Sequence, residues 1–317
     1  MEVNHDRMMK NTLLGALCLS LAASIWGGMY VVSKYVLDYI PPLSLVWMRY
    51  VIAFIFLYAI LFYTQSKRNK GEFSAKKKKT KKDWILLAWI GFIGYFISIA
   101  CQFIGTKLSD AHTGALITSA TPAFMVIFAR FILHEAFTAR KIISVILATI
   151  GVIIVVGWDS GIGTYFVGSM ILVGAAVTWA LLSIYVKVAA RRFSSLETTT
   201  YAILFALLFT TPTMIWEWQT EEFFFNDTLI ILGILYLGIV STAGAFFLWN
   251  KGLELLDAGV GSLFFFLQPI VGSFLGWLVL DEKLDIYFFL GGSLILLGVL
   301  IATVQPRSTN ELKEEPV

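Results

Sequence analysis

The residues with the clearest capacity for chemistry are polar and aromatic side chains that recur at helical spacing inside long apolar stretches. Amide, hydroxyl and indole groups donate or accept hydrogen bonds without carrying a net charge. A polar group in hydrocarbon is costly unless it is paired, so these side chains should face protein or water. We therefore predict one cavity that binds a small molecule, and its predicted residues are Trp26, Tyr30, Ser98, Gln102, Thr118, Thr121, Trp179, Ser183, Trp249, Phe265 and Gln268.

Some of these residues also have a purely structural interpretation. Trp26 and Trp249 could instead anchor their helices at the membrane–water interface. The hydroxyl groups of Thr118 and Thr121 could simply bond to carbonyl groups in the preceding helical turn. The position of the two tryptophans deep in their apolar stretches favours the cavity, whereas both interpretations stay open for the threonines.

The sequence has no pattern typical of an enzyme or of a metal site. The histidines, His5, His112 and His134, lie at the N-terminus and near the edges of apolar stretches, without a second ligand at metal-binding spacing. No phosphate-binding GxxxxGK[ST] loop is present, and the two cysteines fall inside apolar stretches, which excludes a disulfide framework. We expect no catalytic activity, no cofactor and no metal ion.

The elements that must position the cavity are long apolar helices. The chain is 58% hydrophobic and only 14% charged, which is more apolar than a typical soluble domain. Runs of roughly 20 apolar residues are long enough to cross about 30 Å of hydrocarbon as helices. We predict an all-α integral membrane protein with ten transmembrane helices, at about residues 12–33, 43–63, 84–104, 111–133, 139–157, 164–188, 195–216, 227–249, 258–280 and 285–304.

The second half of the chain repeats the first. Residues 105–156 align without a gap with residues 252–303, and the matches include glycine, proline and acidic residues, which an apolar composition does not align by chance. The matched pairs include Gly105 with Gly252, Pro122 with Pro269, Glu135 with Glu282, Gly151 with Gly298 and, further upstream, Gly15 with Gly168, Trp26 with Trp179 and Lys34 with Lys187.

This self-similarity predicts two five-helix repeats, residues 10–158 and 162–306. Because five is odd, the two copies enter the membrane from opposite sides, and such inverted repeats are common in transporters. A duplication that only builds a stable bundle is the alternative. On the transport interpretation, matched positions converge near the membrane midplane. The residues expected to meet there are Trp26, Gln102, Trp179, Trp249 and Gln268.

The distribution of basic residues predicts the orientation. If the N-terminus is cytoplasmic, the basic stretch of residues 67–82 and most other Lys and Arg of the loops lie on the cytoplasmic side. The opposite side keeps only Lys34, Lys107 and Lys283. The positive-inside rule therefore places both termini in the cytoplasm. A run such as residues 76–79 can also bind nucleic acid or anionic lipid, but its position in a short loop between two spans favours a topology signal, and we expect no nucleic-acid partner.

Several motifs resemble a known transporter family. Trp26-Gly27, Lys34, Pro42 and Arg49 resemble the opening of the drug/metabolite transporter superfamily, in its two-repeat EamA-like branch. The residues that resemble the ends of its two repeats are Pro122, Glu135 and Gly151, and Pro269, Glu282 and Gly298. The resemblance implies ten helices, cytoplasmic termini and a central cavity lined mainly by helices 1, 3, 4, 6, 8 and 9. Members of the family carry amino acids, nucleosides and other small metabolites, often outward.

Two arginines lie inside the apolar stretches. Arg130 is about one turn from the cytoplasmic end of its stretch, so its side chain should reach the interface. Arg49 lies deeper, where it could counter a substrate carboxylate or pair with a structural acid such as Asp38. Pro122 and Pro269 should bend their helices and free a carbonyl group one turn earlier, which could contact substrate.

The apolar stretches carry no Asp or Glu near their middle. The small multidrug exporters of the same superfamily couple protons through a carboxylate in their first helix, and that carboxylate has no counterpart here. We expect an exporter of small neutral or zwitterionic metabolites, such as amino acids or their analogues, that acts as a monomer or weak homodimer in the lipid bilayer of the cell membrane. The alternatives are a proton-coupled drug or multidrug exporter and a membrane assembly or sensor protein without transport.

Overall fold

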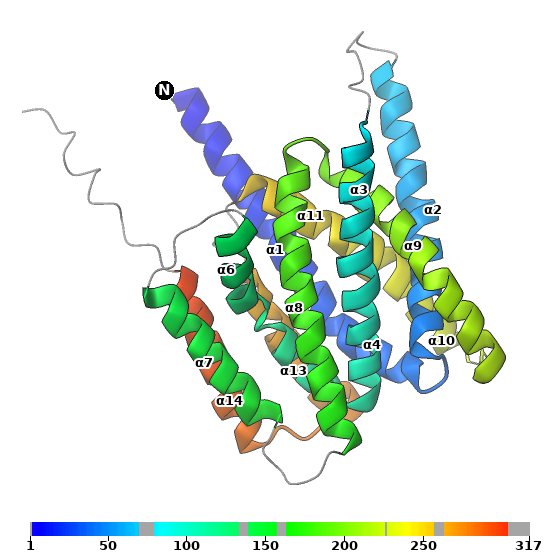
Figure 1. Cartoon of the computed structure of the whole chain (residues 1–317), viewed down its shortest axis with the longest axis vertical. Coiled ribbons are helices and arrows are strands. Elements are labelled where there is room, and N and C mark those ends of the chain that lie inside the picture. Colours follow the sequence, from blue (N-terminus) through cyan, green and yellow to red (C-terminus); the bar gives the residue numbers. More distant parts are fainter. Residues whose placement is uncertain are drawn as a thin grey trace, which may run out of the picture.

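The computed structural model describes residues 2–69, 79–132, 139–156, 163–225, 227–256 and 263–303, and no strand occurs within these ranges. The helices run approximately along one direction (Figure 1), and they include the π-helical segments η1 and η2 and the 3-10 segment η3. In chain order they are α1 (Glu2–Leu37), α2 (Pro42–Asn69), α3 (Lys81–Ile90), η1 (Gly91–Ser98), α4 (Ile99–Leu108), α5 (Ala111–Thr118), α6 (Thr121–Ile132), α7 (Ala139–Val156), α8 (Thr164–Ala190), α9 (Ser195–Thr220), α10 (Thr228–Leu235), η2 (Tyr236–Gly244), α11 (Ala245–Leu255), η3 (Leu263–Phe266), α13 (Leu267–Leu280) and α14 (Ile286–Thr303).

Within the described ranges, seven helical stretches are long and apolar enough to cross a membrane. They are Lys10–Leu37, Pro42–Lys67, Lys81–Leu108, Ala111–Ile132, Thr164–Ala190, Ser195–Thr220 and Thr228–Leu255. Large apolar side chains on the outer faces, such as Phe62, Phe131 and Val279, are exposed, as expected where helices face lipid rather than water. An all-α, multi-pass membrane protein is confirmed. The three remaining predicted spans, at α7, α13 and α14, are shorter as described, so the number of ten stays a prediction.

The helix starts follow from local sequence. Thr80 caps α3: its hydroxyl accepts a hydrogen bond from the Asp83 backbone N–H, and the Asp83 carboxylate accepts one from the Thr80 N–H. Ser194 and Glu197 form the same reciprocal box at the start of α9. Proline at the first position of α2 suits a helix start, where no N–H is needed.

The stretch from α5 to α6 is interrupted at Ser119 and Ala120. Pro122 has no N–H, so it cannot donate to the Thr118 carbonyl four residues earlier. The Thr121 hydroxyl donates to that carbonyl instead, at 2.6 Å. The predicted bend at Pro122 corresponds to this interruption, and the freed Thr118 carbonyl accepts a hydrogen bond from within the chain.

Two π-helical segments interrupt the long helices that contain α3 and α10, and the sequence did not predict them. A π-helical turn carries one extra residue, and such segments occur frequently at functional sites. η1 contains Gly94, and η2 contains Ser241, which the internal repeat aligns with Gly94. The same irregularity therefore recurs at matched places in the two halves.

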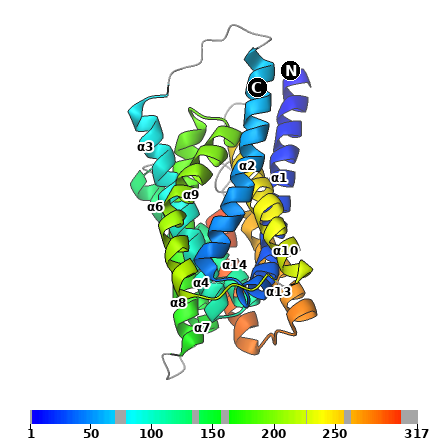
Figure 2. The ribbon, with the colours of Figure 1, turned by 90° about the vertical axis from the view of Figure 1, so that its right-hand side faces the viewer.

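Helices from the two halves of the sequence pack against each other (Figures 1 and 2). α1 packs on α11 and α13, α8 packs on α4, α5 and α6, α2 packs on α9, and α7 packs on α14. Glycines allow the closest approaches: a Cβ on Gly252 would lie 3.1 Å from the Gly15 carbonyl oxygen, and one on Gly168 would lie 2.9 Å from the Gly105 carbonyl oxygen. Small residues at such crossings let membrane helices approach closely.

Candidate functional site

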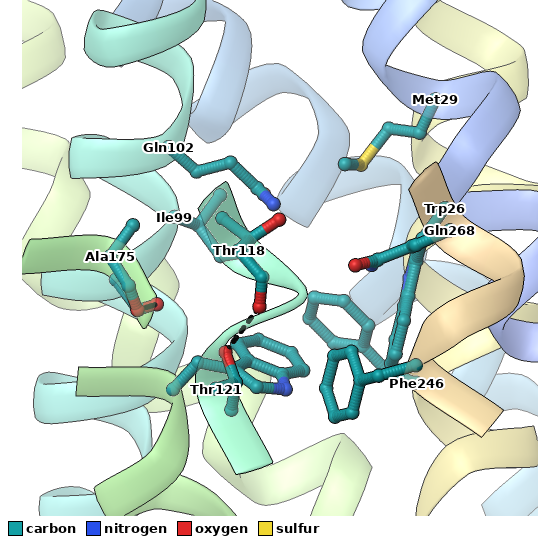
Figure 3. A pocket seen from close by; sticks show the side chains of 12 residues that line it. Trp26, Met29, Ile99, Gln102, Thr118, Thr121, Ala175, Phe246 and Gln268 are labelled. Atoms are coloured by element: carbon teal, nitrogen blue, oxygen red, sulfur yellow. Dashed lines mark hydrogen bonds between the residues drawn. The ribbon is translucent and has the colours of Figure 1, made fainter. Parts of the chain in front are cut away.

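A cavity lies in the interior, between helices of both halves (Figure 3). Segments α1, η1, α4, α5, α6, α8, α11, η3 and α13 contribute its lining. The lining residues are Trp26, Met29, Ser98, Ile99, Gln102, Thr118, Thr121, Ala175, Trp179, Phe246, Phe265 and Gln268.

Most of the predicted binding residues meet at this cavity. Those that line it are Trp26, Ser98, Gln102, Thr118, Thr121, Trp179, Phe265 and Gln268. Three predicted residues do not line it. Tyr30 is fully buried behind Gln102 and Thr118, Trp249 packs against Phe265 with ring centroids 4.4 Å apart, and the Ser183 hydroxyl donates to the Trp179 carbonyl at 3.0 Å. That these residues bind a substrate stays a prediction.

Four lining residues were not predicted from the sequence. Met29, Ile99, Ala175 and Phe246 are apolar residues in apolar helices, so neither their type nor their neighbours distinguish them. Their spacing was the available signal. Met29 follows Trp26 by three positions, which places the two side chains on one helical face.

An aromatic cluster forms one wall of the cavity. The indole of Trp26 lies 5.3 Å from those of Trp179 and Trp249, and 5.9 Å from the ring of Phe246, measured between ring centroids. Edge-to-face and tilted contacts at these distances are favourable for aromatic rings. Only 3% of Trp26 and 2% of Trp249 is exposed. The alternative that they anchor helices at the membrane interface is therefore wrong.

A directed chain of hydrogen bonds fixes the amide of Gln102. The Thr118 hydroxyl donates to the Gly114 carbonyl at 2.7 Å, so it accepts from the Tyr30 hydroxyl at 2.6 Å. The Tyr30 oxygen in turn accepts from Nε2 of Gln102. The Gln102 carbonyl oxygen is left without a hydrogen-bond partner among the described residues. The Thr118 hydroxyl thus bonds to a carbonyl group in the preceding helical turn, as the structural interpretation predicts, and Thr118 also lines the cavity.

Other polar atoms around the cavity, like the Gln102 carbonyl oxygen, lack a hydrogen-bond partner in the described structure. Within the described part of the chain, Oε1 of Gln268 and the indole N–H groups of Trp179 and Trp249 are buried without a partner. By contrast, the Trp26 indole donates to the Ser241 carbonyl at 3.1 Å. Leaving a buried polar group unpaired costs about 1–3 kcal/mol. The cavity therefore offers the amide oxygens of Gln102 and Gln268 as acceptors and the indole N–H of Trp179 as a donor. Trp249 does not line the cavity but packs against Phe265, which does.

The cavity is closed in this structure. Its volume is about 20 Å³, which is room for about one water molecule, whereas sites for small organic ligands usually have about 300–1,000 Å³. The cavity must therefore widen before a metabolite can enter it. Among the residues that the structure describes, no group of three His, Cys, Asp or Glu side chains could hold a metal ion.

Glu282 joins the α13–α14 loop to the start of α5. Its carboxylate accepts hydrogen bonds from the backbone N–H groups of Ala111 and His112 at 2.8 and 3.0 Å, and it lies 2.8 Å from Nδ1 of His112. Burial opposes ionisation, but these hydrogen bonds outweigh it and hold the pKa of the Glu282 carboxyl below its ordinary value of 4.5. Glu282 therefore anchors the α13–α14 loop to the start of α5. Its repeat mate, Glu135, lies outside the described residues.

This contact should make stability depend on pH. Because the folded-state pKa of Glu282 is depressed, its contribution is complete above about pH 4.5 and is lost as pH falls through the lower folded value. We expect Glu282→Gln to lower the melting temperature at pH 7, and the difference from the wild type should shrink as pH falls below about 4.5 through the lower folded-state pKa. Melting curves of both proteins across this range measure the difference. A difference that stays constant with pH would contradict an ionised anchor.

Comparison with known proteins identifies relatives that span nearly the whole chain. The model of the EamA-like transporter family matches residues 13–157 and 166–304. The uncharacterized transporter YetK of Bacillus subtilis (strain 168) is 26% identical over 304 residues, covering 95% of this chain and 90% of its own. An uncharacterized transporter of Archaeoglobus fulgidus is 23% identical over 294 residues, covering 91% and 97%.

The fold is also found among solved structures. One crystal structure superposes with a TM-score of 0.63 at 20% sequence identity, covering 93% of this chain and 96% of that one. The relatives from Bacillus subtilis and Archaeoglobus fulgidus are both named as transporters rather than enzymes. The chain is a multi-pass membrane transporter, and it belongs to the EamA-like transporter family.

Proposed function

We propose that the protein exports small metabolites that combine an apolar part with polar groups, amino acids or their analogues foremost. The observation that carries this proposal is the set of unpaired polar atoms in an aromatic cavity: the amide oxygens of Gln102 and Gln268 and the indole N–H of Trp179. The rings suit an apolar side chain, while the free acceptors suit the N–H groups of an amine. None of the lining residues that the structure describes is acidic, which favours this substrate class over proton-coupled export of lipophilic cations.

The transport cycle that we infer is alternating access between two inverted five-helix repeats, residues 10–158 and 162–306. The pairing of helices supports it, because α1 packs on α13 as α8 packs on α6, and α1 packs on α11 as α8 packs on α4. These are the pairs that the internal sequence repeat exchanges. The π-helical segments at matched positions and the close glycine contacts between the halves also support two related repeats. In this proposal α7, α13 and α14 complete ten spans around the cavity.

We also propose that both termini lie in the cytoplasm and that the protein resides in the cell membrane, on the distribution of Lys and Arg. A cysteine at Glu222, in the acidic segment between α9 and α10, should react with a membrane-impermeant reagent in intact cells. A cysteine at Ala75, which lies outside the described residues, should react only after the cells are opened. The reverse labelling pattern would overturn the orientation and, with it, the inverted-repeat arrangement.

Transport by the purified protein in vesicles tests the function. Counterflow of radiolabelled leucine, methionine and phenylalanine should exceed that of empty vesicles, and a protonophore should leave downhill flux unchanged. The absence of flux for these and for a wider panel of amino acids and nucleosides, with folded protein present, would remove the proposal. Concentrative flux that a protonophore abolishes would favour the proton-coupled alternative.

A further inference from the structure

Arg49 is the one large charged side chain among the fully buried residues of the described structure. Its Nε donates to the Thr242 hydroxyl at 2.5 Å, and its terminal nitrogens lie 3.4 Å from the Ser241 hydroxyl and 3.7 Å from the sulfur of Met29. The guanidinium carbon lies 5.0 Å from the ring centroid of Phe103. Neutral hydroxyl groups, a thioether and an aromatic ring thus surround a cation.

No carboxylate balances this charge. Among the described residues, no Asp or Glu forms an ion pair with Arg49, and Asp38, the acid that the sequence suggested, is not among its contacts. A guanidinium stays protonated in proteins. Contacts with hydroxyl groups and aromatic rings offset only part of the cost of burying it. An anion that reached Arg49 would therefore be bound strongly.

Arg49 lies one side chain away from the cavity. Met29 and Phe246 both line the cavity, and both contact the guanidinium, with the Phe246 ring centroid 5.8 Å from its central carbon. Met29 extends toward the cavity from α1 (Figure 3). A methionine side chain has three rotatable bonds and adapts readily. A change of its rotamer as the repeats separate would expose the guanidinium to the cavity.

We propose that Arg49 is the recognition site for a carboxylate of the transported molecule, with Met29 as the residue that covers it in the closed state. This inference rests on the proposed transport function and narrows the substrate to molecules that carry a carboxylate. The planar fork of N–H donors matches a carboxylate in two-point geometry. The free amide oxygens of Gln102 and Gln268 then accept from an amine of the same molecule, which makes a zwitterionic amino acid the best fit.

Matched pairs of ligands that differ only in this group provide the test. Binding of leucine and leucinamide, and of methionine and methioninamide, is measured on the purified full-length protein by quenching of its tryptophan fluorescence. The wild type should bind each acid more tightly than its amide, roughly 10- to 100-fold, as expected for hydrogen bonds to a charged group. In Arg49→Gln the ratio of the two affinities should fall close to one. Arg49→Lys, which keeps the charge but not the fork, should retain an intermediate ratio.

A second variant, Thr242→Val, distinguishes a role of Arg49 in substrate recognition from a purely structural role. Arg49 could serve only to fasten η2 through Thr242, and Thr242→Val removes that bond while leaving the charge in place. If Arg49 recognises carboxylates, Thr242→Val lowers the melting temperature but keeps the preference for the acid. If the role is only structural, Arg49→Gln and Thr242→Val lower stability alike, and neither changes the ratio of affinities, which would overturn the inference. Should Arg49→Gln fail to fold, the comparison of Arg49→Lys with Thr242→Val decides the question in the same way.

A missing carboxylate site and a missing transport function would give different results. If wild-type vesicles move acids and amides equally well, and Arg49→Lys does not change this, transport stands and the carboxylate site is wrong. If the wild type neither binds nor moves any member of the panel, the proposed function itself is wrong, and the carboxylate site falls with it.

Discussion

Replacing Gln268 by leucine should weaken substrate binding by roughly 5- to 30-fold and leave the protein at least as stable as the wild type. The carbonyl oxygen of Gln268 is buried and has no partner among the described residues. Losing its hydrogen bond to the substrate costs about 1–2 kcal/mol. Removing this unpaired, buried carbonyl oxygen relieves a desolvation penalty in the closed state, so the folding free energy should not fall. The combination of lower affinity with unchanged or higher stability is the distinguishing result.

Binding and melting temperature measured on the same samples check this prediction. Gln219→Leu is the matched control, because Gln219 is exposed near the end of α9 and is not among the residues that line the cavity. It should change neither affinity nor the melting temperature appreciably. If Gln268→Leu binds every substrate as well as the wild type does, Gln268 has no part in recognition. If it is strongly destabilised, the amide has a structural partner.

Replacing Trp26 by alanine should cause the largest loss of folding free energy in the closed state. Trp26 contacts Trp179, Trp249, Phe246 and Phe265, and almost none of it is exposed. Deleting a large buried aromatic side chain costs roughly 3–5 kcal/mol of folding free energy when the surroundings do not collapse. The same deletion enlarges the cavity, so bulkier substrates should gain affinity relative to small ones.

Competition between leucine and phenylalanine for transport, normalised to the folded protein in the vesicle membrane, measures this shift. Trp277→Ala is the control, because Trp277 is exposed on α13, and it should leave selectivity unchanged. A Trp26→Ala protein with wild-type selectivity and stability would show that the aromatic cluster is not part of the transport pathway.

The sequence predicted the helices and most of the cavity because both depend on simple patterns. Long apolar runs specify membrane-spanning helices almost by themselves, since every backbone group must be bonded internally in lipid. The alignment of Trp26 with Trp179 across the repeat, together with buried amides such as Gln102, was sufficient to place these residues near one another. Their convergence is a consequence of packing two similar halves together.

Other features depend on contacts that no local pattern reports. The contribution of Phe246 to the cavity follows from how α11 is rotated against α1, and phenylalanine is too common in these helices to stand out. The contacts of Arg49 come from η2, far away in sequence, whereas the sequence suggested the nearby Asp38. The π-helical segments η1 and η2 were not predicted from the sequence either.

The pairing of α1 with α11 and α13 has a consequence for biosynthesis. α1 is synthesised before α11 and α13, the helices that cover its Gly15 and Trp26 faces, and the rest of the first half and α8 to α10 are made in between. Proteins are synthesised from the N-terminus at about 5–20 residues per second, so α1 waits in the bilayer for most of translation with its partners absent. A chain that is truncated before α11 presents this face to lipid or to the membrane quality-control machinery. The second half of the protein therefore acts as the assembly partner of the first.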